Sequence, residues 1–405
     1  MLALALAPIY ILLNAFTAYW LLRWMAAVHQ IFTHPVVLAV ILVLYVFFSL
    51  SLLTGFLVKR EPFHRILKII SNYWLGVYVY LLGFTVVMVL IHKILSYSPL
   101  YETQLYSQKG LQLVGLAGII SISCMTLYGV WHAHQIRLVR YQVKLKKPLS
   151  LRIALVADLH LGYSIGKYQM TRMVELINRE HPDLVVIAGD IFDNEYEAIR
   201  EPEKVAGILS ELHSRLGTYA CWGNHDLDEK ILAGFTFSGK KEKVPDARFE
   251  HFLEEANIQM LSDEAVFLDQ SFYLAGRKDP ARTEKTGESR CTPPELLNGM
   301  KRNYPILVID HQPKELQELS EQGADIVLGG HTHDGQIFPG NLVTRRIWKN
   351  SCGMLSVGNM YSIVTSGVGL WGPCMRIGTD AEVVMIDVIK NKTGSIPEVN
   401  AAGEP

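Results

Sequence analysis

Acidic residues are almost absent from the first 150 residues of this 405-residue chain. Only Glu61 and Glu102 occur there, against 12 lysines and arginines, so this part carries a charge of about +10. The remainder carries about −11, and the two parts cancel to the net charge of −1. Such an asymmetry is typical of a membrane part joined to a soluble part. The acidic part disfavours nucleic acid as a partner, because binding phosphates requires lysines and arginines.

Charged side chains and histidines are absent from four apolar runs, residues 1–22, 35–58, 69–91 and 110–131. Each run is long enough to cross a hydrocarbon layer of ~30 Å at ~1.5 Å per residue. Buried core helices, the alternative, are rarely this long and this apolar. We therefore predict four transmembrane helices within residues 1–132. Ionisable residues inside a membrane mark ion and proton pathways, so their absence favours an anchor, or a docking surface for an amphiphilic partner, over a pump or transporter.

Paired cysteines are also lacking. The five cysteines contain no CxxC pair, are odd in number, and include Cys124 inside the fourth apolar run. This arrangement excludes a disulfide framework and a zinc-finger spacing. We expect reduced, structural thiols.

The second half of the chain alternates apolar segments with helix-like stretches. A basic connector is predicted over residues 133–150 and a disordered tail over 391–405. Between them, residues 151–390 are predicted to form an α/β domain with largely parallel sheets. The apolar segments of this domain are 152–158, 183–190, 218–226, 271–276, 304–313, 324–333, 361–367 and 382–389. The polar stretches 227–250 and 277–300 are expected to be surface insertions.

Five of the apolar segments end in polar clusters, which read "ADLHLG", "AGDIFD", "GNHD", "IDHQP" and "GGHTH". Taken singly, each cluster has an ordinary explanation as a turn or a helix cap. In open α/β sheets, however, ligands bind beyond the carboxyl ends of the strands. We therefore expect the five clusters, all carrying Asp, His or Asn, to meet in one site.

The clusters resemble the ordered motifs of the calcineurin-like metallophosphoesterases, which are D-x-H, G-D-x-x-D, G-N-H-D, a lone H and G-H-x-H. The resemblance covers residues 150–388, and all five motifs are present in order. Further elements, "GHTH-GQIFP", "GVGLWGP" and "RIG", resemble the branch attached to or exported across bacterial membranes. That branch often has glycine where Asp334 stands here, so the turn after His333 is expected to differ and to carry an extra carboxylate.

The resemblance implies a four-layer α/β/β/α sandwich that binds two divalent metal ions. The first ion would be held by Asp158, His160, Asp190 and His333. The second would be held by Asn224, His311, His331 and the same Asp190, which bridges the two. Mixed imidazole and carboxylate ligands suit Mn²⁺, the preferred candidate, and also Fe or Zn²⁺, better than Mg²⁺ or Ca²⁺.

The resemblance also implies the remaining roles. His225 would protonate the leaving oxygen or stabilise developing charge, and Asp193 would orient its ring. Arg277 is a candidate for binding a substrate phosphate, with a surface salt bridge as the alternative. The expected reaction is attack of metal-activated hydroxide on a phosphate ester or pyrophosphate, and the anchor favours an amphiphilic or lipid-linked substrate. The rival hypothesis is a non-catalytic, metal-stabilised membrane scaffold or receptor. The oligomeric state stays open.

The basic residues outside the apolar runs predict the topology. The loops after the first and third runs hold only Arg23, Lys93 and Lys109. Nine basic residues lie on the other side: Lys59, Arg60, Arg65, Lys68, Arg137, Arg140, Lys144, Lys146 and Lys147. Because cytoplasmic loops are the ones rich in lysine and arginine, we expect both termini and the α/β domain in the cytoplasm. The basic connector is expected to lie against anionic head groups.

Overall fold

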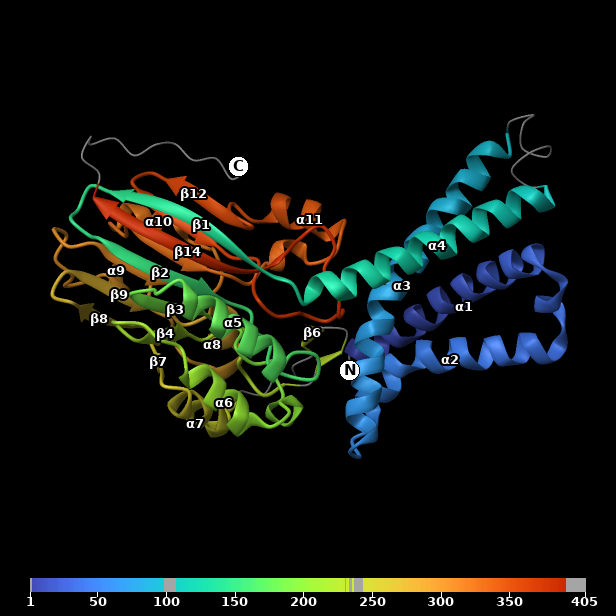
Figure 1. The fold of residues 1–405 in the computed structure, drawn as a ribbon, viewed down its shortest axis with the longest axis horizontal. Helices are drawn as coiled ribbons and strands as arrows, with labels where there is room; N and C mark the ends of the chain where they lie inside the picture. The colour runs from blue at the N-terminus through green and yellow to red at the C-terminus, as the bar shows by residue number, and fades with distance from the viewer. Residues whose placement is uncertain (1, 98–106, 230, 233–234, 237–242, 391–405) are drawn as a thin grey trace. The chain divides into compact units, whose positions relative to one another are not determined.

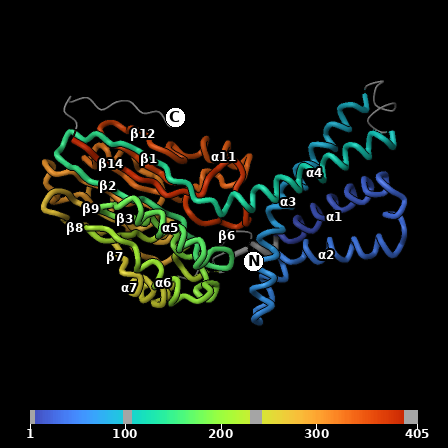
Figure 2. Tube along the Cα trace, in the orientation of Figure 1, coloured from blue at the N-terminus to red at the C-terminus, as the bar shows by residue number. Residues whose placement is uncertain are grey.

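A computed structural model describes residues 2–97, 107–229, 231–232, 235–236 and 243–390 (Figures 1 and 2). The chain divides into two compact units. The first comprises residues 1–131 with the short segments 231–237 and 372–375, and the second comprises the rest. The predicted tail, 391–405, lies outside the described residues.

The first unit contains four long helices, which confirm the four predicted apolar runs. They are α1 (Leu2–Val28), α2 (Pro35–Leu57), α3 (Phe63–Leu95) and α4 (Gln108–Ala133). A short 3-10 helix, η1 (Gln30–Thr33), precedes α2. All four long helices are long and apolar enough to cross a membrane. The third begins six residues before its predicted run and takes in Arg65 and Lys68.

Polar side chains join three of these helices to one another. Tyr10 of α1 donates a hydrogen bond to the Ser49 carbonyl of α2 (2.8 Å) and accepts one from the Trp74 indole of α3 (3.1 Å). Tyr45 of α2 donates to the Asn14 carbonyl of α1 (3.1 Å). Apolar burial does not drive helices together inside a lipid layer, so hydrogen bonds and packing do. This network uses only neutral side chains, as expected for an anchor.

The second unit is built on two six-stranded sheets. The first sheet runs in the order β1 (Ile136–Leu145), β14 (Ala381–Lys390), β2 (Leu151–Val156), β3 (Leu184–Ala188), β4 (Thr218–Cys221), β7 (Ile258–Met260). The second runs β12 (Gly353–Val357), β13 (Met360–Val364), β11 (Ile326–Gly329), β10 (Ile306–Ile309), β9 (Phe272–Gly276), β8 (Glu264–Leu268). Strands β2, β3, β4 and β7 are parallel, as are β9, β10, β11 and β13.

The two sheets face each other across a shared core, to which both contribute buried side chains such as Ile153, Val186, Leu307 and Ile363. Helices α5 (Lys167–Arg179), α6 (Pro202–Ser210) and α7 (Ala247–Glu255) cover the first sheet (Figure 1). Helices α9 (Pro293–Leu296) and α10 (Leu316–Glu321) pack on the outer face of the second. The predicted four-layer α/β/β/α sandwich is thereby confirmed. Its inner strands are apolar throughout because both of their faces are buried.

Shorter elements complete the chain. They are η3 (Tyr196–Ala198), β5 (Ile231–Leu232), β6 (Phe235–Thr236), α8 (Pro280–Thr286), η4 (His333–Gly335) and α11 (Gly340–Ile347). Two of them, η4 and α11, directly follow strand β11 and its histidines.

The segment predicted as a basic connector, 133–150, is a strand over most of its length. Strand β1 runs parallel to β14 with Ile136 opposite Ala381, and forms the edge of the first sheet. Its basic side chains pair within the unit: Arg137 with Asp380 (2.9 Å) and Arg140 with Glu180 (2.8 Å). The predicted connector is therefore mostly an edge strand of the domain, whereas its contact with lipid head groups stays a prediction. Charged residues alternating with apolar ones are typical of an edge strand.

Candidate metal centre

The five polar clusters meet at the carboxyl ends of strands from both sheets, as predicted. Strands β2, β3 and β4 of the first sheet, and β10 and β11 of the second, each lead into one cluster. The side chains they deliver are Asp158, His160, Asp190, Asp193, Asn224, His225, His311, His331 and His333. Most are buried; Asp193, Asn224 and His331 are partly exposed. The site thus lies at the shared end of the two sheets, open on one side.

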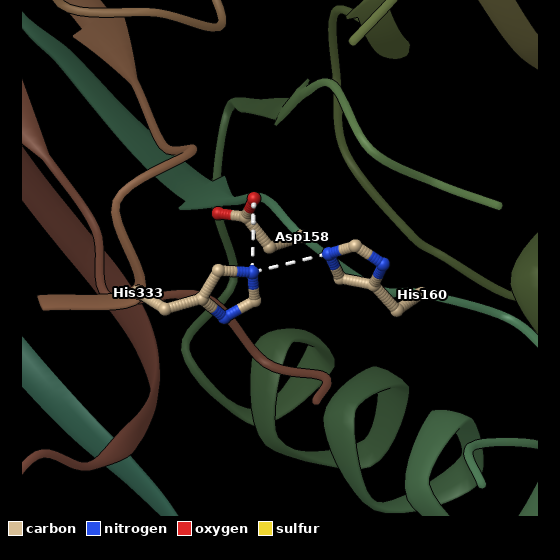
Figure 3. A group of neighbouring side chains, drawn as sticks. All are labelled: Asp158, His160 and His333. Atoms are coloured by element: carbon tan, nitrogen blue, oxygen red, sulfur yellow. Dashed lines mark hydrogen bonds and ion pairs between the residues drawn. The ribbon is translucent and has the colours of Figure 1, made fainter. Parts of the chain in front are cut away.

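One group of ligand atoms consists of Asp158, His160 and His333 (Figure 3). The Nε2 atoms of His160 and His333 are 3.1 Å apart, and His333 Nε2 lies 3.5 Å from Asp158 Oδ1. Asp190 Oδ2 lies 3.9 Å from His160 Nε2. Three loops, after β2, β3 and β11, therefore aim their donor atoms at one small volume.

The second group consists of Asp190, His311 and His331, with Asn224 beside them. His311 Nε2 lies 3.1 Å from Asp190 Oδ2, 3.2 Å from His331 Nδ1 and 3.2 Å from Asn224 Oδ1. The other ring nitrogen of His311, Nδ1, is 2.8 Å from the Ala188 carbonyl. Because that carbonyl only accepts, Nδ1 carries the proton and Nε2 is free to bind a metal. Asp190 Oδ2 belongs to this second group and also lies 3.9 Å from His160 Nε2 of the first.

The donor set fits two divalent cations. Around an ion with bonds of ~2.1 Å, neighbouring ligand nitrogens are roughly 3.0 to 3.4 Å apart, close to the spacings observed here. Burial raises the pKa of Asp158 to about 6. A metal ion beside this carboxylate would supply the positive charge that stabilises its ionised form. Burial lowers the pKa of His331 to about 3, which keeps this imidazole neutral, as metal binding requires. Mixed nitrogen and oxygen donors suit Mn²⁺, Fe or Zn²⁺.

The backbone at the site is strained. Five of the ligand residues have left-handed φ angles: Asp158 (53°), His160 (46°), Asp190 (50°), His331 (75°) and His333 (49°). Each such residue costs of order 1–3 kcal/mol, and such strain is concentrated at functional sites. Hydrogen bonds from the loops hold it in place. The His331 amide donates to Asp158 (2.9 Å), and the His225 amide donates to Asp190 Oδ1 (2.7 Å).

Asp226 ties the loops after β3 and β4 together. Its buried carboxylate accepts hydrogen bonds from the amides of Phe192 (2.8 Å) and Gly223 (2.7 Å). These two bonds fix the backbone that carries Asp190 and Asn224.

The partner of His225 is Asn194 in this structure. His225 Nδ1 lies 2.6 Å from Asn194 Oδ1, while Asn194 Nδ2 donates to the Leu227 carbonyl (2.9 Å). Because that carbonyl only accepts, the amide oxygen must face His225. His225 Nδ1 therefore carries a proton, which leaves Nε2 as the atom that can meet a substrate. Burial lowers the pKa of His225 to about 4, so the ring is neutral near pH 7 without metal.

The predicted orienting residue, Asp193, pairs with His160, with its Oδ1 3.4 Å from His160 Nδ1. Asp193, His160 and His225 also form a group whose potential ligand atoms all lie within 4.8 Å of one another, so Asp193 lies beside both rings. The chain turns at Asn194, whose φ is 63°, and it is the Asn194 side chain that hydrogen-bonds to His225. The sequence signal for Asn194 was only its position directly after the G-D-x-x-D motif.

Arg277, predicted to contact a substrate phosphate, is only 1% exposed. Its Nη1 pairs with Asp310 (2.8 Å) and Glu315 (3.0 Å), and Nη2 donates to the Cys291 carbonyl (3.0 Å). With both terminal nitrogens engaged and two carboxylates beside it, the guanidinium is neutralised within the fold. The structure assigns it a structural role in place of the predicted contact.

Two charged side chains support His333 from behind. The fully buried Arg376 donates to the carbonyls of Ser366 (2.8 Å) and Gly369 (2.8 Å), and its Nη2 is 3.4 Å from His333 Nδ1. In the sequence, Arg376 is distinguished only by its place in "RIG", which does not predict a contact with the site. The extra carboxylate, Asp334, has a φ of 45° and pairs with Arg345 of α11 (3.1 Å). It therefore fastens the turn to α11.

A methyl group added at Gly223 tests the packing around Asp190. A Cβ there would lie 2.2 Å from Asp190 Oδ1, so Gly223→Ala must displace the Asp190 carboxylate, which lies between the two groups. We expect metal affinity to fall about 10–100-fold, as when groups supporting ligands are lost. Gly207→Ala in α6 is the matched control, because nothing lies within 4 Å of its added Cβ. The measurement is the metal content per chain after dialysis. Equal metal content in both variants would contradict this packing.

Comparisons with known proteins agree with the site. The family model for calcineurin-like phosphoesterases matches residues 151–335. A transmembrane protein with metallophosphoesterase domain from Danio rerio is 33% identical over 349 residues, covering 82% of this chain and 75% of the relative. The Bos taurus protein of the same description is 28% identical over 354 residues, with the same coverage. UDP-2,3-diacylglucosamine pyrophosphatase LpxG of Chlamydia trachomatis is 22% identical over 257 residues, covering 53% of this chain and 76% of the relative.

The motifs, the fold, the ligand geometry and these relatives all point the same way. The chain belongs to the calcineurin-like metallophosphoesterases, as a metal-dependent phosphoesterase with four helices suited to cross a membrane.

Proposed function

We propose that this protein is a membrane-anchored, dinuclear phosphoesterase that hydrolyses a phosphate ester or phosphoanhydride bond of a lipid-linked substrate. One observation carries the proposal. Asp190 Oδ2 lies between two groups of ligand atoms, 3.9 Å from His160 and 3.1 Å from His311. Beside them stands His225, an imidazole whose Nδ1 is already engaged by Asn194. A ligand set with an additional, oriented imidazole is what phosphoryl transfer to water requires.

Each residue has a defined task in this proposal. One ion would be held by Asp158, His160, Asp190 and His333, and the other by Asn224, His311, His331 and Asp190. Two such ions, when bound, lower the pKa of a water molecule and neutralise the charge on the phosphoryl group. Mn²⁺ suits this set best, with Fe or Zn²⁺ as alternatives. Asp193 and Arg376 keep His160 and His333 in their ligand orientations.

His225 would act on the substrate itself. Asn194 holds the proton on Nδ1, so Nε2 is the ring nitrogen left for a phosphoryl or leaving oxygen. A bound phosphate places negative charge next to the ring and favours its protonated form. The ring would then donate its proton to the leaving oxygen. A metal-stabilised scaffold, the rival hypothesis, needs the ligands but has no use for the His225–Asn194 pair.

Two observations support a lipid-linked substrate. The four helices keep the phosphoesterase unit within reach of a membrane, so an amphiphilic substrate in that membrane is always nearby. The Chlamydia trachomatis relative is named as a pyrophosphatase of a diacylated, nucleotide-linked sugar. Turnover of water-soluble nitrophenyl phosphates, together with inertness toward every membrane-embedded phosphate, would contradict this part of the proposal.

Metal removal tests the dinuclear centre. Because Asp190 is shared, Asp190→Asn should lower the content of both ions and reduce turnover by at least about 100-fold, whereas His160→Ala should lose less metal. Turnover of a nitrophenyl phosphate and metal content are measured on the same samples, with Mn²⁺ added back after chelation. Full activity in the chelated protein or in Asp190→Asn would refute the dinuclear centre.

Substitution of His225 separates proton transfer from metal binding. His225→Ala should keep near-normal metal content and lose about 10²–10⁴-fold in turnover, the scale of general-acid contributions. Asn194→Ala should show a smaller loss of the same kind, because the ring stays but its orientation is lost. Both losses should shrink for nitrophenolate, a leaving group that needs little protonation. Equal losses for good and poor leaving groups would remove His225 as the acid.

The proposed topology places the phosphoesterase unit in the cytoplasm. It rests on the nine basic residues flanking the spans on one side against three on the other. Arg137, Arg140 and Lys147 form ion pairs within the folded domain, but the bias acts on the chain as it inserts. The sequence therefore supports a cytoplasmic position for the domain. The ion pairs of these residues give no support for contact between strand β1 and the head groups.

Reporter fusions test this topology. A C-terminal alkaline phosphatase should be inactive in intact cells, because that enzyme works only when exported, and the matching fluorescent protein should be bright. A fusion after residue 97, on the opposite side of the third span, serves as the control and should give the reverse pattern. An active phosphatase at the C-terminus would place the domain outside.

A further inference from the structure

Exposed apolar side chains gather in one place on the phosphoesterase unit. Among its described residues, seven large apolar side chains are exposed, and four of these lie between residues 338 and 347. They are Phe338 (47% exposed), Leu342 (44%), Val343 (53%) and Ile347 (69%). The other three, Tyr168, Val244 and Phe267, are far apart in the sequence. Single exposed apolar residues are ordinary, whereas a contiguous group marks a surface that binds something.

Helix α11 carries this group on one of its two faces. The inner face holds the buried Asn341 and the half-buried Thr344, and Trp348 follows the helix at the same spacing. Arg345 is itself exposed and pairs with Asp334. The outer face holds Leu342, Val343, Arg346 and Ile347, all exposed. We call this outer face, with Phe338 before it and Lys349 after it, the α11 surface.

The stretch of sequence that carries the α11 surface is basic, whereas the unit as a whole is acidic. Residues 335–379 contain no Asp or Glu, whereas residues 151–405 as a whole carry about −11. Arg346 and Lys349 are exposed within the surface. An apolar stripe flanked by basic side chains is the pattern by which a helix lies in the head-group region of an anionic bilayer. A soluble acidic protein would match the charge but not the apolar stripe.

The α11 surface is directly attached to the metal centre. Trp348, which follows Ile347, packs its ring edge-on against the His331 imidazole, with centroids 5.2 Å apart. At the other end, a Cβ on Gly335 would lie 2.2 Å from the Gly340 carbonyl carbon, so the chain folds back tightly between His333 and the helix. Whatever binds this surface therefore lies next to the ligand His331.

We propose that the α11 surface docks onto the anionic phospholipid bilayer that holds the chain's own spans. The four helices keep the unit tethered, so even a weak contact is populated at high local concentration. Docking sets the metal centre beside the head groups, where the phosphate of a membrane lipid would enter. That the substrate is a lipid rests on the proposed function above. The docking contact is independent of that function.

Photo-crosslinking of the full chain tests the contact. The protein is placed in nanodiscs of phosphatidylcholine with phosphatidylglycerol, with the photoreactive p-benzoylphenylalanine introduced at Val343 or at Ile347. Leu127, exposed on α4, is the positive control, and Phe267, exposed on β8, is the matched negative control. We expect lipid adducts at 343 and 347 at least about tenfold above those at 267. Adducts at 127 alone, or crosslinks from 347 to a second copy, overturn the proposal.

A second measurement links docking to turnover. The ratio of hydrolysis of a phosphatidylglycerol-embedded phosphate ester to that of a soluble nitrophenyl phosphate is compared before and after Val343→Ser with Ile347→Ser. We expect the ratio to fall about tenfold, and to stay unchanged for Phe267→Ser. An unchanged ratio despite lipid adducts at 347 would keep the docking and refute the lipid substrate. Absence of both hydrolyses in the unsubstituted protein would refute the proposed function, while the crosslinks still decide the docking.

Discussion

The buried carboxylate of Asp190 is the interaction on which the centre depends. Its Oδ1 accepts a hydrogen bond from the His225 amide, and its Oδ2 faces His311 and, farther away, His160. Gly223 packs so closely that no side chain fits between it and this carboxylate. Four loops from two sheets thus converge on a single anionic group, and the left-handed backbone of the ligands is the cost of that convergence. Positive charge supplied by metal ions would balance the carboxylates that burial brings together.

The sequence predicted the part of the site that follows from strand geometry. Parallel strands end at the same edge of a sheet, so residues directly after them, such as Asp158 and His331, had to converge. The partner of His225 could not be predicted in this way. Whether Asp193 or Asn194 faces that ring depends on the φ of 63° at Asn194, a property of the folded loop. The ion pair of Arg277 could not be predicted for a related reason. Its partner Asp310 follows a different strand of the same sheet.

The fold showed the same division between local and non-local information. Apolar runs such as β3 and β10 were identified because they are buried on both faces. The basic residues of strand β1 are spaced as in a juxtamembrane segment, so the sequence predicts a connector there. Partners distant in the sequence neutralise two of them: Asp380, directly before β14, pairs with Arg137, and Glu180 pairs with Arg140. The same short charge pattern is compatible with a juxtamembrane connector and with an edge strand. Only the partners distant in the sequence distinguish the two.

The charge distribution determines which face of the domain can lie next to an anionic bilayer. An acidic domain of about −11 next to an anionic bilayer is repelled by it, and four spans supply proximity without overcoming that repulsion locally. The acid-free stretch from 335 to 379 removes the repulsion at one place, and α11 adds apolar contact there. Because that place adjoins His331, the face of the domain that the membrane tolerates is also the face that carries the chemistry. Tethering then determines where the enzyme is, and α11 determines which way its metal centre points.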